Sequence, residues 1–387
     1  MARFGDGLAT GGDLLAAAEQ ATEQALVPLG GRVPDLLCVF ASSTSPQELD
    51  EALRRAAQVS AAGAAVGCSA AGVIGGSRGV EGVSAVSVFA AVLPGVRART
   101  FHLEVMRAEA GAAVVGLPEL DGDDVAVLLA DPYSFPADGF IAQANTALPG
   151  LPVVGGLAAG PLGAGSTRLL VDGRVVDRGA VGVLLQGSGV RTLVSQGCRP
   201  VGPAMTVTAA AGNVVRELAG IPALQRVEQV LAELPPVDQA LASSGLHLGI
   251  AMDEYAEEHD FLVRSILGGE RETGGIVVGD LVEVGRTVRL QVRDADAADA
   301  DLRALLAGYR RDTRDAPAGG ALLFSCNGRG AHLFGSAHGG ADHDPALVQG
   351  ELAALGVAGF FAGGELGPVA GRNHLHGFTA SVLAFPC

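Results

Sequence analysis

The chain is 387 residues long, 49% hydrophobic but only 4% aromatic, and it carries a formal net charge of −16. A chain this rich in apolar residues can bury the cores of two or three domains, which excludes an intrinsically disordered protein. Its negative charge repels phosphate backbones and anionic lipids, so neither nucleic acid nor a membrane surface is an expected partner.

A repeated pattern begins after an N-terminal segment, residues 1–30. The apolar run Leu36–Phe40 predicts a buried strand. Ser45, with Pro46 after it and Glu48 three positions on, forms a capping box that predicts the start of a helix. The rest of this first copy is predicted to be a second strand, a glycine-rich turn and a third strand, at Ala64–Val66, Gly67–Gly72 and Gly82–Phe89.

The same order of elements recurs twice along the chain. The second copy is expected at Val125–Leu129, Phe140–Leu148, Pro152–Val154, Gly155–Gly160 and Gly179–Leu185. The third is expected at Ala321–Phe324, Asp344–Leu355, Val357–Phe361, Gly363–Pro368 and Gly377–Phe385. A strand–helix–strand step predicts a right-handed parallel crossover, and the strand after the turn is expected to pair antiparallel. The predicted fold class is α/β, with mixed sheets built from three β-α-β-β-like units in two domains.

The pattern changes between the second and third copies. There the sequence predicts a helix, two short strands, an alternating strand and a second helix, at Ala223–Leu234, Leu246–Ile250, Phe261–Val263, Val282–Val292 and around Leu302 and Leu305. A boundary near Pro222 gives an N-terminal domain, residues 31–222, with two copies. The C-terminal domain, residues 223–387, then holds the third copy and the insertion.

A series of short motifs, in order over almost the whole chain, resembles one known family. The motifs are Val66–Gly72 with Glu81-Gly82, Val153–Gly156, Ser195–Gly202, Gln291–Asp294, Phe324–Gly330, Gly359–Glu365 and His376–Thr379. On these residues the chain resembles the FIST family, with a FIST N-terminal and a FIST C-terminal domain.

The resemblance implies a bacterial signal-transduction module that senses small ligands, with amino acids as the usual suggestion. Haem binding with nitric-oxide or redox sensing is the alternative, because some bacterial members are associated with it. No kinase, cyclase or receiver segment is attached to this sequence. The output is therefore expected to pass to a separate signalling protein, such as a kinase or cyclase.

The glycine-rich turns are the first candidates for a ligand pocket. Ligands of open α/β sheets bind at the carboxyl ends of strands, where each of these turns lies. Successive backbone N–H groups in such turns can hold an anion, although glycine could also serve the turn alone. The candidate residues in the turns are Gly67, Cys68, Ser69, Gly155, Gly156, Gly363 and Gly364.

The densest polar cluster is Ser325–Gly330. Arg329 offers two parallel hydrogen bonds to a carboxylate, and Asn327 can both donate and accept. Cys326 is a weak candidate nucleophile, and its alternative role is that of a small buried hydrophobic residue. Ser325, Cys326, Asn327 and Arg329 are therefore predicted ligand contacts.

Glu365 follows two glycines beside an apolar strand, where a buried carboxylate must be paired or functional. Its candidate partners are Arg199, Arg293 and Arg329. If Glu365 took an ammonium group and an arginine took a carboxylate, the pocket would suit an amino acid or another small carboxylate. A plain ion pair is the alternative.

Two histidines are candidates for haem. His374 and His376 stand two positions apart, so on a strand both would point to one face. Either could be an axial ligand, and ordinary hydrogen bonding in a loop is the alternative. Gln196, Arg199, Arg293 and Asn373 complete the predicted ligand-binding residues, together with Glu365 and His376.

Several chemistries are excluded by composition. The sequence has no lysine, so no Schiff base, PLP anchor or P-loop lysine is available. It also lacks GxSxG, HExxH and Walker A motifs, so an enzyme that uses Cys326 or Glu365 is the less favoured hypothesis. The cysteines are scattered without a CxxC, which predicts neither disulfides nor a structural metal site. With no signal peptide and no long apolar run, we expect a cytoplasmic protein without a cofactor, haem being the exception considered above.

Overall fold

The computed structural model describes residues 1–108, 111–254, 261–314 and 317–387. These residues form two compact units. Unit 1 comprises residues 1–195, 301–375 and 379–387, and unit 2 comprises residues 196–300 and 376–378. The predicted N-terminal domain, residues 31–222, thus spans unit 1 and the start of unit 2, because residues 196–222 pack with the insertion.

Unit 1 contains all three repeats, each with more strands than the sequence pattern predicts. The first repeat consists of β1 (Arg3–Thr10), α1 (Leu14–Leu26), the 3-10 turn η1 (Val27–Leu29), β2 (Leu36–Ser42), α2 (Pro46–Ser60), β3 (Ala64–Ser69), β4 (Gly72–Gly75), β5 (Arg78–Glu81) and β6 (Ala85–Val92). The second consists of β7 (Arg97–Ala108), β8 (Gly111–Val115), β9 (Val125–Ala130), α3 (Ala137–Ala147), β10 (Val153–Leu157), β11 (Leu169–Val171), β12 (Arg174–Val176) and β13 (Ala180–Gln186). The third consists of β14 (Arg191–Ser195), α6 (Ala295–Asp312), β22 (Ala318–Cys326), α7 (Gly330–Phe334), η2 (Ser336–His338), η3 (Gly340–Asp342), α8 (His343–Leu352), β23 (Gly356–Ala362), β24 (Glu365–Val369), β25 (Arg372–His376) and β26 (Ala380–Pro386).

The predicted pairing within each repeat is confirmed. The strands before and after the helix are parallel in all three repeats: β2 with β3, β9 with β10, and β22 with β23. The last strand returns antiparallel to the first, which pairs β6 with β2, β13 with β9 and β26 with β22. Each sheet is therefore mixed, and its centre has the order last, first, second strand.

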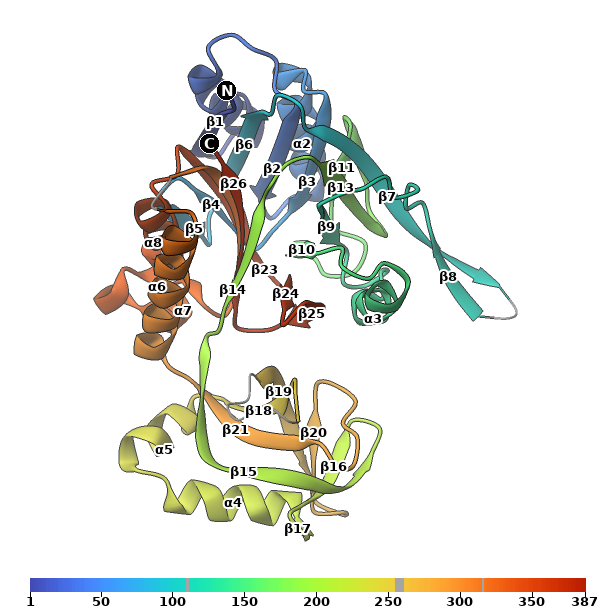
Figure 1. Ribbon diagram of the computed structural model, residues 1–387, viewed down its shortest axis with the longest axis vertical. Coiled ribbons are helices and arrows are strands. Elements are labelled where there is room, and N and C mark those ends of the chain that lie inside the picture. Colours follow the sequence, from blue (N-terminus) through green and yellow to red (C-terminus); the bar gives the residue numbers. More distant parts are fainter. Residues whose placement is uncertain (109–110, 255–260, 315–316) are drawn as a thin grey trace. The chain divides into compact units, whose positions relative to one another are not determined.

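The hairpins β4–β5, β11–β12 and β24–β25 each join the sheet of a different repeat (Figure 1). β4 of the first repeat pairs antiparallel with β23 of the third. β11 of the second repeat pairs with β3 of the first, and β24 of the third pairs with β10 of the second. Each sheet thus receives a hairpin from another repeat. The first repeat gives its hairpin to the third, the third to the second and the second to the first, so the exchange forms a closed ring.

The three sheets of unit 1 share one core and carry helices on their outer faces. Side chains from all three sheets meet in a single apolar cluster, where Phe40 of β2 lies 5.1 Å from Phe360 of β23 between ring centroids. Outside, α1 and α2 cover the first sheet, α3 covers the second, and α6 and α8 cover the third. This arrangement requires strands that are apolar over nearly their whole length, such as β2, because both of their faces are buried.

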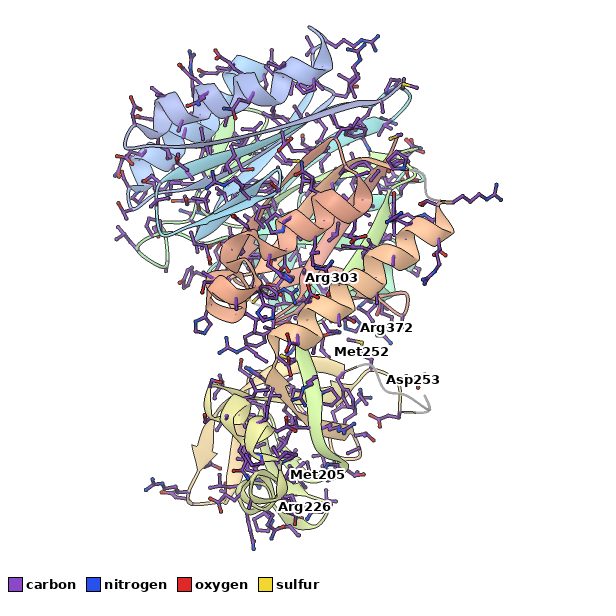
Figure 2. The ribbon with its side chains drawn as sticks, turned by 90° about the vertical axis from the view of Figure 1, so that its left-hand side faces the viewer. Met205, Arg226, Met252, Asp253, Arg303 and Arg372 are labelled. Carbon is purple, nitrogen blue, oxygen red and sulfur yellow. The ribbon has the colours of Figure 1, made fainter. Side chains whose placement is uncertain are left out.

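Unit 2 is inserted into the third repeat between β14 and α6, whose first residues it includes. Its elements are β15 (Cys198–Ala211), β16 (Val214–Leu218), β17 (Ile221–Pro222), α4 (Ala223–Glu233), α5 (Pro236–Ser243), β18 (Leu246–Ala251), β19 (Phe261–Glu270), β20 (Gly275–Val278) and β21 (Thr287–Arg293). The sheet has the order β15-β21-β18-β19-β20-β16-β17, and β15 also pairs with β16, so the sheet curls back on itself. Met205, labelled in Figure 2, is buried in a core that this sheet shares with Val227 and Val230 of α4.

Three sequence predictions are corrected by these elements. Residues 1–30 are not a separate segment, because β1 pairs with β6 and α1 packs on the first sheet. The third strand of the first repeat is β6, which begins at Ala85 instead of Gly82, since the hairpin β4–β5 occupies the preceding residues. The alternating strand predicted from Val282 begins at Thr287, after a turn in which Gly285 has a φ of 95°.

The N-terminal strand was hidden from the apolar pattern by its glycines. A Cβ atom at Gly5 would come within 2.2 Å of the carbonyl oxygen of Ala25, and one at Gly7 within 1.9 Å of that of Ala21. These glycines let α1 lie directly against β1. None of the helices in the described part of the chain combines the length and apolar character needed to cross a bilayer.

Candidate functional site

The glycine-rich segments after β3, β10 and β23 meet one another in unit 1. The amide of Ala159 donates to the carbonyl of Ser69 at 3.0 Å, which joins the second repeat to the first. The amide of Gly363 donates to the carbonyl of Leu157 at 3.0 Å, which joins the third repeat to the second. The structure therefore brings these three predicted segments together at strand carboxyl ends.

Two glycines predicted to lie in turns belong to the strands instead. Gly67 lies within β3 and Gly155 within β10. A Cβ atom at Gly67 would come within 2.3 Å of the carbonyl oxygen of Val39, and one at Gly155 within 2.0 Å of that of Leu128. The close approach of the neighbouring strand requires both glycines, and the bends begin only after β3 and β10 end.

Cys68 and Gly156, also predicted as ligand contacts, are buried in the same strands. Burial raises the pKa of the Cys68 thiol well above its usual value, and the neighbouring Cys38 adds to the effect. Gly156 pairs with Glu365 across β10 and β24, and a Cβ atom there would come within 2.8 Å of Cβ of Ala362. Both positions therefore serve strand packing.

A pocket of about 380 Å³ opens beside two of the glycine-rich segments. Its walls come from the end of β2 and the loops after β2, β3, β5 and β10. They are formed by Ser42, Ser43, Thr44, Ala70, Ala71, Gly82, Val83, Ser84, Ala159, Gly160 and Pro161. These residues offer hydroxyl groups and backbone amides but no charged side chain, so the pocket suits a small, strongly hydrogen-bonding molecule.

The pocket wall formed by Ser43 and Thr44 immediately precedes the N-terminus of α2 in the chain. The hydroxyl of Ser45 accepts a hydrogen bond from the amide of Glu48 at 3.3 Å, as the predicted capping box requires. The carboxylate of Glu48 accepts instead from the hydroxyl of Ser43 at 2.7 Å. The positive end of the helix dipole therefore lies next to the wall formed by Ser43 and Thr44, where it favours a negatively charged group.

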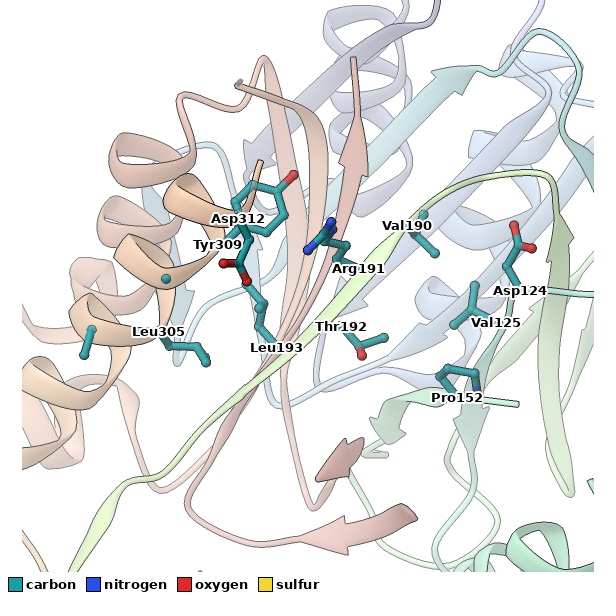
Figure 3. Close-up of a pocket in the computed structure, with 12 residues that line it drawn as sticks. Asp124, Val125, Pro152, Val190, Arg191, Thr192, Leu193, Leu305, Tyr309 and Asp312 are labelled. Atoms are coloured by element: carbon teal, nitrogen blue, oxygen red, sulfur yellow. The ribbon is translucent and has the colours of Figure 1, made fainter. Parts of the chain in front are cut away.

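A second pocket, of about 550 Å³, was not predicted from the sequence (Figure 3). It lies between β14, α6 and the start of β9. Figure 3 shows Arg191 of β14 directed toward Tyr309 and Asp312 of α6. Burial raises the pKa of Tyr309, although the charge of Arg191 opposes the rise.

Arg329 forms a buried ion pair in the polar cluster at the end of β22. Its side chain has no exposed surface, and Nε and Nη2 donate to the two carboxylate oxygens of Asp344 at 2.7 and 2.9 Å. The same carboxylate accepts from the hydroxyl of Ser325 at 2.7 Å and lies 2.9 Å from Nδ1 of His343. Burial alone would raise the pKa of Asp344, but the charge and hydrogen bonds of Arg329 hold it well below its usual range.

Glu365 is the second buried carboxyl group of this region. One of its oxygens accepts from the amide of Thr379 at 3.1 Å and from its hydroxyl at 2.9 Å. Within the described residues, the other oxygen has no hydrogen-bond partner of standard geometry. Burial raises the pKa of Glu365 to about 8, against the opposing effects of Thr379, Cys326 and Arg329.

The predicted neighbours Arg329, Cys326 and Glu365 are thus brought together. The positive charge of Arg329 and the Cys326 side chain both lower the pKa of Glu365, against the larger effect of burial. Asn327 follows, and its side-chain oxygen lies 3.8 Å from the thiol of Cys326. Asp344 was missed as the partner of Arg329, because its sequence position marks it as the start of a helix and gives no sign of a buried pair.

Asn373 and the two candidate histidines lie on β25. The side-chain oxygen of Asn373 accepts from the amide of Val153 at 2.8 Å, and its side-chain nitrogen donates to the carbonyl of Leu151 at 2.9 Å. These two hydrogen bonds therefore hold β25 against the segment that immediately precedes β10. His374 and His376 are on one strand two positions apart, as predicted, and His376 is buried.

The remaining predicted residues belong to unit 2. Arg199 pairs with Asp238 and, through Nε at 2.6 Å, with Asp294, and these hydrogen bonds raise its pKa. Arg293 donates to the carbonyl of Ser244 at 3.1 Å. Gln196 is the first residue of the unit. In the part of the chain that the structure describes, no group of three or more His, Cys, Asp or Glu side chains could hold a metal ion.

Comparison with known proteins gives a consistent result over the chain. The family model of the FIST N domain matches residues 35–221, and that of the FIST C domain matches residues 223–368. An uncharacterized protein of Mycobacterium tuberculosis is 43% identical over 99% of this chain and 99% of its own length. An uncharacterized protein of Mycobacterium bovis is 42% identical over 99% of this chain and 98% of its own. The two family matches meet at residue 222.

Proposed function

This chain belongs to the FIST family, and from that premise we propose that it binds a small molecule in the 380 Å³ pocket at the ends of β2 and β3. FIST domains are associated with small-ligand sensing in signal transduction. The observation that carries the proposal is that two of the glycine-rich segments both line this pocket, through Ala70 and Ala71 after β3 and Ala159 and Gly160 after β10.

The lining favours an amino acid or another small carboxylate. The hydroxyl of Thr44 can donate to a carboxylate beside the positive end of α2, whereas the hydroxyls of Ser42 and Ser43 already donate to Val83 and Glu48. Arg329 does not line this pocket and is already paired with Asp344, so it is not the carboxylate ligand of this site. The charge of the bound group is instead balanced by the hydroxyl of Thr44 and the positive end of the α2 dipole.

The proposal extends to the route of the signal. Ala159 is hydrogen-bonded to Ser69, so a ligand between these segments contacts two repeats at once and can change how they meet. A separate signalling protein, such as a kinase or cyclase, would read that change. This cytoplasmic sensing role is tested first by finding the ligand.

Thermal unfolding of the purified chain in a panel of amino acids and small organic acids identifies the ligand by the rise in Tm it causes. Isothermal titration then measures its Kd. The pocket-filling variant Ala71→Leu is expected to lose binding, because Ala71 lines the pocket and is exposed, so the larger side chain does not disturb the core.

The matched control is Ala142→Leu, at an exposed position of α3 that does not line the pocket. It should bind the ligand as the unaltered chain does. A panel without any Tm shift, or a ligand that binds Ala71→Leu as tightly as the unaltered chain, would refute this site.

A further inference from the structure

Two buried polar side chains face each other across β18 and β21 in unit 2. His247 pairs with Gln291 in the strand register, and they expose only 6% and 1% of their surfaces. Within the described residues, both ring nitrogens of His247 lack a hydrogen-bond partner, and so does the side-chain nitrogen of Gln291. Buried donors without partners are costly, and a ligand that accepts hydrogen bonds would remove the cost.

The ring of Phe378 lies against the His247 ring of this pair. Its centroid is 4.3 Å from that of the His247 ring, and the guanidinium of Arg293 lies over it at 5.6 Å. Phe378 has a φ of 64°, a left-handed conformation that is unfavourable for a residue with a bulky side chain. Such strain tends to mark switch regions and ligand contacts.

We propose that unit 2 binds a planar aromatic carboxylate, which displaces the Phe378 ring, takes its place beneath Arg293 and accepts hydrogen bonds from His247 and Gln291. The aromatic ring of the ligand replaces the ring of Phe378, and it makes the same contacts with the His247 ring and the Arg293 guanidinium. The carboxylate satisfies the orphaned donors, and its charge is balanced by Arg293. This site lies in unit 2 and goes beyond the proposed function, whose pocket lies in unit 1.

The protonation state of His247 fits a carboxylate better than a cation. Burial and, to a smaller extent, the charge of Arg293 lower the pKa of His247 to about 4, so the ring is neutral near pH 7. A neutral imidazole offers one N–H donor, and the amide of Gln291 offers another. Two donors beside a guanidinium form an arrangement that a carboxylate matches.

The test uses the full chain and benzoate as the probe. NMR of the imidazole nitrogens follows His247, whose signals are identified by their loss in His247→Gln. Benzoate is expected to shift these signals and to bind at least about tenfold more tightly than acetate, which lacks the ring, or benzamide, which lacks the charge. Unchanged His247 signals at saturating benzoate would overturn the proposal.

Phe378→Gly tests the displacement directly. Glycine adopts a φ of 64° without strain and removes the covering ring, so benzoate is expected to bind about tenfold more tightly than to the unaltered chain. An affinity that is unchanged or weaker would show that Phe378 does not occupy the site.

Gln291→Glu tests whether the ligand contacts Gln291, because a carboxylate at this position repels an anionic ligand and attracts a cationic one. The substituted side chain has nearly the same shape but repels benzoate, and it should favour the cationic analogue benzamidine. The control Gln239→Glu alters an exposed residue of unit 2 and should leave both affinities unchanged. Equal benzoate affinity in Gln291→Glu and Gln239→Glu contradicts the proposal. If Gln291→Glu fails to fold, the Phe378→Gly variant alone decides.

Ala71→Leu, which fills the pocket of unit 1, should still bind benzoate in unit 2. Failure of the proposed function in unit 1 therefore remains distinguishable from failure of this proposal.

Discussion

Arg329 is the largest side chain in the described part of the chain that has no appreciable exposed surface. The sequence singled it out as a two-pronged partner for a carboxylate, and that chemistry is present, but the carboxylate is Asp344 of the protein itself. Composition and spacing identify a residue's hydrogen-bonding capacity. They cannot say which of many acidic residues folds against it, because Asp344 reaches Arg329 through the packing of α8 on the third sheet.

Removing this arginine should destabilise the fold. We expect Arg329→Met to lower the free energy of unfolding by about 3–5 kcal/mol, because Asp344 is left as a buried charge without its cation. Urea unfolding measures the loss. Arg310→Met, which breaks a half-exposed pair with Glu351 at 3.4 Å, should cost at most about 1 kcal/mol. Similar losses for the two variants would show that burial of the pair does not matter.

Glu365 should make stability fall as the pH rises. An unfolded glutamate titrates near 4.5, whereas the folded value is about 8, so between these values the folded state holds the additional proton. Its stabilising effect is complete below the unfolded pKa and is lost as the pH rises through the folded pKa, by an amount on the order of a few kcal/mol. Asp344, with its pKa lowered, acts in the opposite sense, and its contribution is lost only in acid.

Glu365→Gln isolates this effect, because the amide oxygen can still accept from Thr379 but the side chain no longer titrates. We expect the difference in unfolding free energy between the variant and the unaltered chain to shift in favour of the variant from pH 5 to pH 8.5. Urea unfolding at several pH values measures it. Parallel stability curves would mean that Glu365 has an ordinary pKa in the folded chain.

At the scale of elements, the crossover strands and helices of the repeats were predictable and the hairpins were not. Apolar runs such as Leu36–Phe40 mark strands buried on both faces, and the Ser45 capping box marks the start of α2. β4 and β5 are short, contain three glycines and are completed by a strand from another repeat, so no local sequence pattern predicts them. The pocket was predictable only in part, since Ala70 and Ala71 follow the predicted turn residues whereas Ser42–Thr44 and Ser84 were never proposed.

The same element in each repeat depends on one glycine. Gly359 of β23 is equivalent to Gly67 and Gly155, and a Cβ atom there would come within 1.7 Å of the carbonyl oxygen of Leu323. We expect Gly359→Ala to destabilise the chain by several kcal/mol, because the clash is with backbone that cannot move aside. Gly139→Ala is the matched control. It lies in α3 with nothing within 4 Å, so it should be neutral or stabilise by up to about 1 kcal/mol.

Thermal unfolding of both variants checks this prediction. A soluble Gly359→Ala protein whose Tm matches that of Gly139→Ala would show that the parallel strands can separate at low cost.

At the scale of the whole molecule, the two units should differ in their ability to fold alone. Unit 2 has its own apolar core and a sheet whose hydrogen-bonded partners all lie between residues 196 and 300. Residues 1–195 hold two repeats but lack β23 and β24, which complete the exchange of hairpins. We therefore expect residues 196–300 to give a dispersed amide NMR spectrum and residues 1–195 to give a collapsed or insoluble product. Independent folding of residues 1–195 would contradict the need for the third repeat.

The ring of exchanged hairpins also sets an order of events on the ribosome. β4 emerges early in translation, but β23, the strand it must pair with, is made only after most of the chain has been synthesised. Until then one edge of β4 stays open, and the polypeptide has to delay the closure of its first repeat or rely on a chaperone to shield that edge. The yield of this protein should therefore fall when translation is slowed or chaperones are scarce, because the open edge of β4 is then exposed for longer.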